Sequence, residues 1–233
     1  MRFVSTFACY RNIALRISVH NKSGELDSFE LAPSKIIAVG RNYRAHAEEL
    51  GNAVPKSPLI FFKPPSAVIG SGSAIVCPGG YERVDYEGEL AVVIGKRGRN
   101  ISESDALGHV FGASCLNDVT VRDLQKSDGQ WTRAKGFDTF CPIGPRIACG
   151  LELGNLEIST RKNGETVQQS NTRLMVHSIA KVIAFISAAM TLEAGDVIAT
   201  GTPAGVGPIA PGDVVEIEIE GIGVLRNDVV AES

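Results

Sequence analysis

The chain of 233 residues contains few cysteines, few aromatic side chains and little net charge. Its five cysteines are scattered, odd in number and without a Cys-x-x-Cys pair, which argues against a disulfide framework or a zinc site. That pattern is typical of buried thiols in a reducing cytosol. The net charge of −3 at pH 7 gives no support for a nucleic-acid partner or for an anionic membrane surface.

Long hydrophobic runs are also missing. No stretch approaches the roughly twenty apolar residues that a membrane span requires. Residues 1–10 are mildly apolar, but Arg11 and Asn12 end the run, so we expect no signal peptide and a cytoplasmic protein. Heptads, low-complexity segments and internal repeats of about 20–50 residues are absent as well. The length suits one domain with a small appendage and a substantial core.

Short apolar runs separated by glycine and proline predict many short strands. Residues 13–19 and a segment near Phe29 predict an N-terminal β-hairpin. A single long helix is predicted over residues 179–190, where the apolar side chains form one broad stripe. The expected fold class is therefore α+β, mostly β. We expect an N-terminal β appendage over residues 1–34 and a main domain over residues 35–233.

Two glutamates lie near the start of an apolar strand predicted over residues 85–95. Side chains alternate along a strand, so Glu87 and Glu89 point to the same side, and apolar residues follow on both faces. Neighbouring carboxylates on a buried strand must be protonated, paired with basic side chains or bound to a cation. Asp118 ends the next apolar stretch and completes a cluster if the two strands are adjacent. Oxygen ligands without a nearby His or Cys favour Mg²⁺, with Mn²⁺ or Ca²⁺ as alternatives.

A second run of alternating glutamates, at residues 213–220, serves as an internal comparison. There, valine and isoleucine alternate with glutamate along the whole strand, which predicts a half-exposed strand with solvated glutamates. A lone Glu-x-Glu pair is more often such a surface feature. The spacing of Glu87 and Glu89 alone therefore leaves both a surface and a site interpretation open.

Other candidate residues are individually ambiguous. His46 and Glu49 are three residues apart on a predicted short helix, so they share one face. They form either a general base oriented by a carboxylate or a surface pair, and spacing alone favours the surface pair. Lys63 and Lys135 could each face a ligand or lie on the surface. The surface interpretation is favoured because most lysines are solvated. Residues 200–208 form a loop of glycines and prolines whose exposed backbone N–H groups suit an anionic ligand.

Six stretches, taken together and in order, resemble the fumarylacetoacetate hydrolase family, especially its short bacterial single-domain members. Each stretch is weak alone, but the six cover most of residues 35–227. They are residues 39–43 with His46, 62–64, 85–90, 117–125, 134–138 and 201–207.

The resemblance implies a mixed β-roll fold around a Mg²⁺ site, usually in a homodimer. It implies three roles, namely metal ligands at Glu87, Glu89 and Asp118, a water-activating dyad of His46 and Glu49, and Lys135 near the substrate oxyanion. It further implies a substrate-binding role for the remaining motif residues, which are Arg41, Asn42, Tyr43, Gln125 and Thr202.

The activity implied by the resemblance is Mg²⁺-dependent chemistry on a 2-oxo or 2,4-dioxo acid through a metal-stabilised enolate. Hydrolysis of a C–C bond in an acylpyruvate-type substrate is the expected reaction. The same enolate arises by proton transfer or loss of CO₂, so the 2-hydroxyhepta-2,4-diene-1,7-dioate isomerase of aromatic catabolism and oxaloacetate decarboxylase are alternatives. A non-catalytic, metal-stabilised binding protein is an alternative of another class. His46 and Glu49 together argue against it, because a structural site needs no base.

Overall fold

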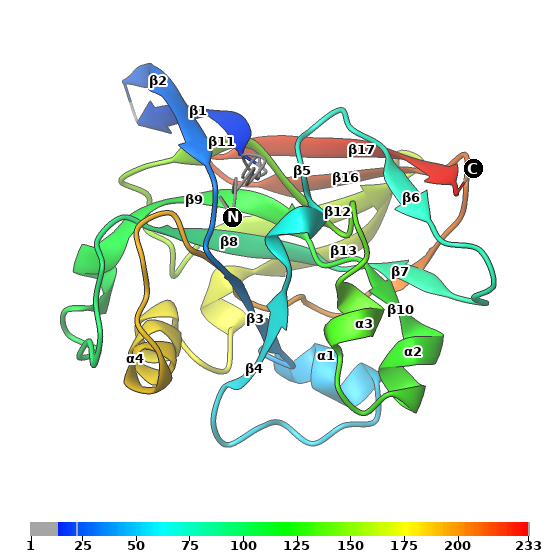
Figure 1. Cartoon of the computed structure of the whole chain (residues 1–233), viewed down its shortest axis with the longest axis horizontal. Helices are drawn as coiled ribbons and strands as arrows, with labels where there is room; N and C mark the ends of the chain where they lie inside the picture. The colour runs from blue at the N-terminus through cyan, green and yellow to red at the C-terminus, as the bar shows by residue number, and fades with distance from the viewer. Residues whose placement is uncertain (1–13, 22, 233) are drawn as a thin grey trace, which may run out of the picture.

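The structure is a computed structural model that describes residues 14–21 and 23–232. The start of the predicted first strand and the mildly apolar residues 1–10 lie outside the described residues. Strands dominate the architecture and few helices accompany them, as predicted (Figure 1). No helix in the described part of the chain has the length and apolar character needed to cross a membrane.

The largest sheet has nine strands in a mixed parallel and antiparallel arrangement. Eight of them follow the order β2-β1-β11-β9-β8-β14-β3-β4, and β5 pairs with β11. The strands are β1 (Leu15–Asn21), β2 (Gly24–Leu31), β3 (Ile36–Gly40), β4 (Leu59–Lys63), β5 (Val68–Ile69), β8 (Gly88–Ile94), β9 (Val110–Asn117), β11 (Cys141–Ala148) and β14 (Val197–Ala199).

Two smaller sheets complete the β structure. A five-stranded sheet in the order β13-β12-β16-β17-β6 consists of β6 (Ile75–Cys77), β12 (Glu157–Lys162), β13 (Glu165–Asn171), β16 (Val214–Ile219) and β17 (Gly223–Ala231). A three-stranded sheet in the order β10-β7-β15 consists of β7 (Val84–Tyr86), β10 (Thr120–Val121) and β15 (Gly207–Ile209). In β16, Ile217 and Ile219 are buried whereas Glu218 is exposed, so this strand has the predicted wet face.

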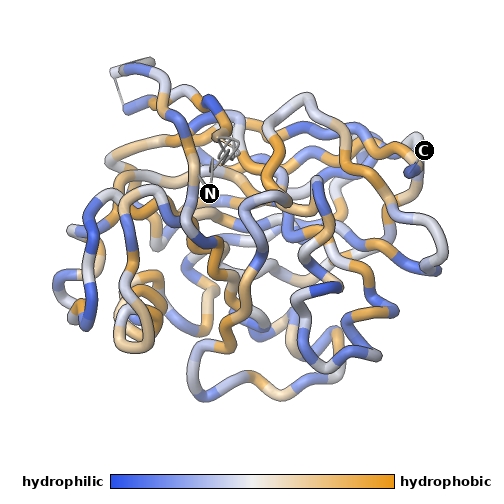
Figure 2. Tube along the Cα trace, in the orientation of Figure 1, coloured by the Kyte–Doolittle hydropathy of each residue, from blue (hydrophilic) through white to orange (hydrophobic). Residues whose placement is uncertain are grey.

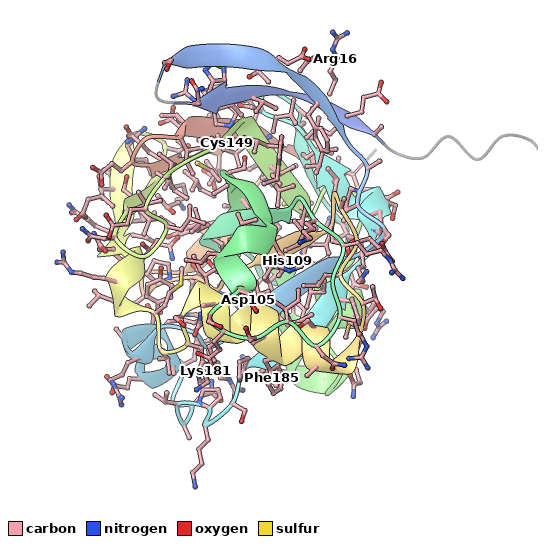
Figure 3. All side chains as sticks on the ribbon, turned by 90° about the vertical axis from the view of Figure 1, so that its left-hand side faces the viewer. Arg16, Asp105, His109, Cys149, Lys181 and Phe185 are labelled. Atoms are coloured by element: carbon pink, nitrogen blue, oxygen red, sulfur yellow. The ribbon has the colours of Figure 1, made fainter. Side chains whose placement is uncertain are left out.

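The helices fall into two groups. Short helices α1 (Arg44–Glu49), α2 (Arg122–Ser127) and α3 (Thr132–Lys135) lie together at the lower right of Figure 1, apart from α4 (Ile179–Ala189). Ser178 caps α4 by accepting a hydrogen bond from the Lys181 N–H. Short 3₁₀ turns are η1 (Pro65–Ala67), η2 (Ala106–His109) and η3 (Thr172–Leu174). Figure 3 shows α4, with Lys181 and Phe185 labelled, beside the segment that carries Asp105 and His109.

The N-terminal hairpin extends the large sheet. β1 pairs in parallel with β11, and Ser18 lies opposite Arg146. The buried side chains of Ile17 and Val19 belong to the same hydrophobic cluster as Ile36. The hairpin thus shares a core with the main fold, and the division of the chain at residue 34 stays a prediction.

β8 lies at the centre of the molecule and is buried along its whole length. On one face, Leu90 and Val92 pack in the cluster that includes Ile183 of α4. On the other face, Ala91 and Val93 pack with the cluster of the large sheet and the hairpin. Figure 2 shows hydrophobic residues along α4 and β3, two of the elements that pack around β8. Both faces of β8 are therefore packed against hydrophobic clusters, and Glu87 and Glu89 lie at its buried N-terminal end.

Candidate metal and substrate site

Three buried carboxylates meet where β8 begins and β9 ends. β8 and β9 are antiparallel neighbours, with Gly88 opposite Asn117, and the Asp118 N–H donates to the Glu87 carbonyl oxygen at 2.8 Å. Each of Glu87, Glu89 and Asp118 offers an oxygen, and these three oxygens lie within 4.8 Å of one another. Each of these residues is 4% exposed or less. The structure thus brings together the three residues singled out as metal ligands.

Basic side chains surround two of these three carboxylates. Asp118 lies between two lysines, with its Oδ1 2.7 Å from Lys63 Nζ and its Oδ2 2.6 Å from Lys135 Nζ. Glu87 lies between Lys135 Nζ at 2.8 Å and a nitrogen of Arg122 at 2.6 Å. The charges of Lys135 and Arg122 outweigh the effect of burial and hold the pKa of Glu87 below its usual range. Glu87 and Asp118 are therefore compensated anions.

Glu89 has no such cation. Its carboxylate accepts a hydrogen bond from the Gly201 N–H at 2.8 Å, and no ion pair reaches it within the described residues. Burial, together with the charges of Asp118 and Glu87, raises its pKa well above the usual range. A cation bound between the three carboxylates would stabilise the charged form of Glu89, which burial and the two neighbouring carboxylates disfavour. The all-oxygen donor set fits a hard divalent ion such as Mg²⁺, Mn²⁺ or Ca²⁺.

A fourth acid belongs to the same network. Asp85 is fully buried, and its Oδ2 accepts from Arg122 Nε at 2.8 Å while its Oδ1 accepts from Arg83 Nε at 2.7 Å. Asp85 and Arg122 were not singled out as site residues. The sequence did contain a signal for Asp85, because it occupies the alternate position before Glu87 and so shares its face of the strand.

His46 and Glu49 contact each other on α1. His46 Nδ1 lies 3.3 Å from Glu49 Oε2, and the Glu49 carboxylate also accepts from the Gly205 N–H at 3.0 Å. Glu49 thereby connects α1 to the glycine-rich loop that precedes β15. His46 is buried, and Nε2 is its ring nitrogen without a protein partner in the described part of the chain. The pair has the arrangement of an oriented base.

A cavity of about 340 Å³ lies between His46 and the three carboxylates of Glu87, Glu89 and Asp118. Eight of the eleven residues singled out from the sequence line it, namely Arg41, His46, Glu87, Glu89, Asp118, Gln125, Lys135 and Thr202. Asn42, Tyr43 and Glu49 do not line it. Asn42 is buried, and its amide is bonded to the backbone of His177 and Thr200. The Tyr43 hydroxyl is buried, and burial followed by the charge of Glu89 raises its pKa far above the usual range.

Gln168 connects three parts of the site and was not singled out. Its Nε2 donates to Thr202 Oγ1 at 2.9 Å, and its Oε1 accepts from the Gly88 N–H at 3.0 Å and from Thr160 Oγ1 at 2.8 Å. A Cβ on Gly88 would lie 2.2 Å from that Thr160 oxygen, so the position between Glu87 and Glu89 requires glycine. Nothing in the local sequence distinguishes Gln168 from its exposed neighbour Gln169.

Comparison with known proteins agrees with this arrangement. A family model described as fumarylacetoacetate (FAA) hydrolase C-terminal matches residues 35–230. The chain belongs to this family. It is an enzyme, and the predicted family and its mostly β fold are confirmed.

Relatives within the family carry different activities. The structure of 2-hydroxyhepta-2,4-diene-1,7-dioate isomerase from Mycobacterium marinum is 44% identical, with a TM-score of 0.81 over 90% of this chain and 84% of that one. Fumarylpyruvate hydrolase from Pseudomonas aeruginosa, in complex with Mn²⁺ and pyruvate, is 32% identical, with a TM-score of 0.82 over 93% and 97%. The mitochondrial oxaloacetate tautomerase Fahd2a of Rattus norvegicus is 44% identical over 85% of this chain and 67% of that protein.

Proposed function

We propose that this member of the fumarylacetoacetate hydrolase family is a divalent-metal-dependent enzyme that hydrolyses a C–C bond of an acylpyruvate-type substrate. The observation that carries the proposal is the buried cluster of Glu87, Glu89 and Asp118 in one cavity with His46 and Lys135. An ion held by the three carboxylates would polarise the substrate oxygens as a Lewis acid. A relative of the same fold, crystallised with Mn²⁺ and pyruvate, supports this assignment.

Lys135 supplies a permanent positive charge. Burial lowers its pKa, but the charges of Asp118 and Glu87 outweigh burial, and the net pKa is raised. Its ammonium group therefore stays charged in the cavity, where it stabilises negative charge that develops on a substrate oxygen.

Gln125 and Thr202 are arranged as hydrogen-bond donors. Gln125 Oε1 accepts from Arg122 at 2.7 Å, so its amide N–H groups are left to donate. Thr202 Oγ1 accepts from Gln168, so its hydroxyl hydrogen points to another partner. Both line the cavity, and such donors suit the carboxylate of a 2-oxo acid.

His46 acts as the base in this proposal. Its imidazole takes a proton from water, and Glu49 fixes the ring and stabilises the imidazolium that forms. The oxygen of that water attacks the distal carbonyl of the 2,4-dioxo acid. The C–C bond then breaks, its electron pair passes to the enolate of pyruvate, and a proton completes the product.

A second candidate is enol–keto isomerisation on the same residues. The 44% identity to an oxaloacetate tautomerase and to a dienedioate isomerase favours it. In this reaction His46 moves a proton between two substrate atoms and no water is consumed. Magnesium as the ion, a homodimer and a cytoplasmic location also stay predictions, and light scattering in solution checks the dimer.

One parallel assay separates the candidates. Acetylpyruvate, fumarylpyruvate and the enol form of oxaloacetate are offered with Mg²⁺, with Mn²⁺ and with EDTA. Pyruvate together with acetate or fumarate establishes hydrolysis, whereas accelerated ketonisation without pyruvate establishes the isomerase. Glu89→Gln is expected to abolish metal binding in calorimetry. A protein that turns over none of these substrates, or one that binds Mg²⁺ equally well after this substitution, contradicts the proposal.

A further inference from the structure

The glycine-rich loop of residues 200–206 donates backbone hydrogen bonds to two acidic side chains of the site. The Gly201 N–H donates to the Glu89 carboxylate at 2.8 Å. The Gly205 N–H donates to both oxygens of the Glu49 carboxylate, at 3.0 and 3.3 Å. The sequence predicts an anionic ligand for the N–H groups of this loop. At these two positions the anions are carboxylates of the protein itself, one from the metal cluster and one from α1.

Glu49 depends on Gly205 for its orientation. The Glu49 side chain is 34% exposed, and its hydrogen-bond partners among the described residues are the Gly205 N–H and His46 Nδ1. The helix that carries it, α1, has six residues and no side-chain cap at its N-terminus, so it is not stable by itself. A glutamate on such a helix samples several rotamers unless a partner holds its carboxylate. The direction of the Gly205 N–H therefore sets where the Glu49 carboxylate lies relative to His46.

Gly205 is held from both sides. Its φ of 98° lies in the left-handed region, and a Cβ there would lie 2.1 Å from the Val167 carbonyl oxygen, so the position requires glycine. Glycine leaves the two flanking peptide groups more freedom to rotate than any other residue does. The Tyr86 hydroxyl donates to the Gly205 carbonyl oxygen at 2.8 Å and fixes the peptide group that follows. The N–H that binds Glu49 belongs to the peptide group that precedes.

The pairing of β7 with β15 places Tyr86 for this contact. Tyr86 lies opposite Gly207 in that pair and is 3% exposed. A Cβ on Gly207 would lie 2.9 Å from the Tyr86 hydroxyl oxygen, so glycine at this position leaves the space that the hydroxyl occupies. Tyr86 does not line the cavity between His46 and the three carboxylates. Its hydroxyl therefore acts on the loop and not on a bound substrate.

We propose that Tyr86 is a positioning residue for His46. The Tyr86 hydroxyl fixes Gly205, and the Gly205 N–H fixes Glu49. The Glu49 carboxylate then orients the imidazole of His46 for proton transfer. This inference rests on the proposed function, because it takes His46 to be the base. It applies equally to hydrolysis and to enol–keto isomerisation, since His46 moves a proton in both reactions.

The first test compares kcat, KM and Mg²⁺ affinity in Tyr86→Phe, which removes the hydroxyl and keeps the ring. With the substrate that the parallel assay identifies, kcat is expected to fall about threefold to tenfold, the effect of one net hydrogen bond. KM and the calorimetric Kd for Mg²⁺ should stay within about twofold, because the hydroxyl contacts neither substrate nor metal ligand. Tyr81→Phe is the matched control, because Tyr81 is half-buried, packs on Phe137 and does not line the cavity.

A double-mutant cycle shows whether Tyr86 acts through Glu49. Glu49→Ala removes the acceptor of the Gly205 N–H, so adding Tyr86→Phe to it should lower kcat by less than about twofold. An equal effect of Tyr86→Phe on kcat with and without Glu49 would overturn the inference. A loss of Mg²⁺ affinity that matches the loss of kcat would also overturn it, because the effect would then pass through the neighbouring Glu87.

Amide hydrogen exchange in Mg²⁺ gives a readout that needs no turnover. Tyr86→Phe should make exchange of the Gly205 N–H about threefold to tenfold faster, towards its rate in Glu49→Ala, and Tyr81→Phe should not change it. An unchanged rate in Tyr86→Phe would overturn the inference whatever the activity of the protein. A folded wild type that shows the expected exchange but turns over none of the three substrates would support the connection from Tyr86 to Glu49 and contradict the proposed function itself.

Discussion

The Nζ atom of Lys63 lies 2.7 Å from Oδ1 of Asp118, and both side chains are excluded from solvent. The same ammonium group donates to the backbone carbonyl of Lys135. A single buried cation thereby fixes one proposed metal ligand and the backbone that carries the proposed oxyanion partner. Lysines are almost never fully buried unless they are paired, and Asp118 is the acidic partner of Lys63.

Replacement of Lys63 by methionine should destabilise the metal-free protein. The change keeps the side-chain volume but leaves Asp118 with only Lys135, and removing one partner of a buried pair costs about 3 kcal/mol. Urea unfolding in EDTA measures the loss. Lys56→Met, at an exposed position, is the control and should change the free energy of unfolding by less than about 0.5 kcal/mol. Equal stability of the two variants would show that the Lys63–Asp118 contact is not needed.

Replacement of His46 by alanine should lower kcat by about 10²–10⁴, the usual range for a lost general base. The Mg²⁺ affinity should not change, because His46 is not one of the three clustered carboxylates. Steady-state kinetics and calorimetry measure the two quantities. His109→Gln removes a half-buried imidazole that contacts the Lys96 carbonyl and does not line the cavity, so it serves as the control. A near-wild-type kcat in His46→Ala would remove His46 from the role of base.

Replacement of Gln168 by leucine should raise KM for the 2-oxo acid about tenfold. Thr202 loses the donor that orients its hydroxyl, and the buried Gly88 N–H loses its acceptor, at a cost of about 1–3 kcal/mol in stability. Thr202→Val should raise KM similarly, and the double variant should be less than additive.

The control for this prediction is the adjacent position. Gln169→Leu alters an exposed side chain on the opposite face of β13 and should leave KM unchanged. If the effects of Gln168→Leu and Thr202→Val on KM are fully additive, the two residues do not act through one another.

His177 should make the protein less stable in mild acid. Its Nε2 lies 3.2 Å from the Pro55 carbonyl oxygen, and its buried Nδ1 has no partner among the described residues. Burial, followed by the charge of Lys181, lowers the pKa of His177. The folded state therefore favours the neutral ring, and stability is lost as the pH falls from about 6.5 towards the folded pKa.

Urea unfolding at pH 8, 7, 6 and 5 checks this dependence. If unfolding takes up one proton, the free energy of unfolding changes by at most about 1.4 kcal/mol per pH unit. His177→Gln should flatten the slope between pH 6.5 and 5, and His109→Gln should not. An unchanged slope in His177→Gln would assign the acid sensitivity to another group.

Much of the fold could be predicted from local pattern. The apolar runs and turn residues indicated a mostly β chain, and Ser178 with its apolar stripe indicated α4 to within one residue of its end. The alternation around residues 213–220 correctly indicated a half-exposed strand. These features depend on the period of side chains along one element, which the sequence displays directly.

Local sequence pattern predicted only part of the candidate site. Alternation placed Glu87 and Glu89 on one face of a strand, and the order of six short motifs indicated the family. Local pattern could not distinguish the buried Lys63 from an ordinary surface lysine. It also could not distinguish Gln168 from Gln169, although one is buried at the site and the other is exposed.

The sequence by itself determined which residues share a face, where the helix begins and which family the chain resembles. Only the tertiary structure decided that Lys63, Asp118 and Lys135 meet, and that Gln168 reaches Thr202. These partners are separated by 17 to 72 residues along the chain. Their contact depends on the order in which strands pair and on the placement of short helices at the sheet edge. Long-range pairing of this kind leaves no period in the local sequence.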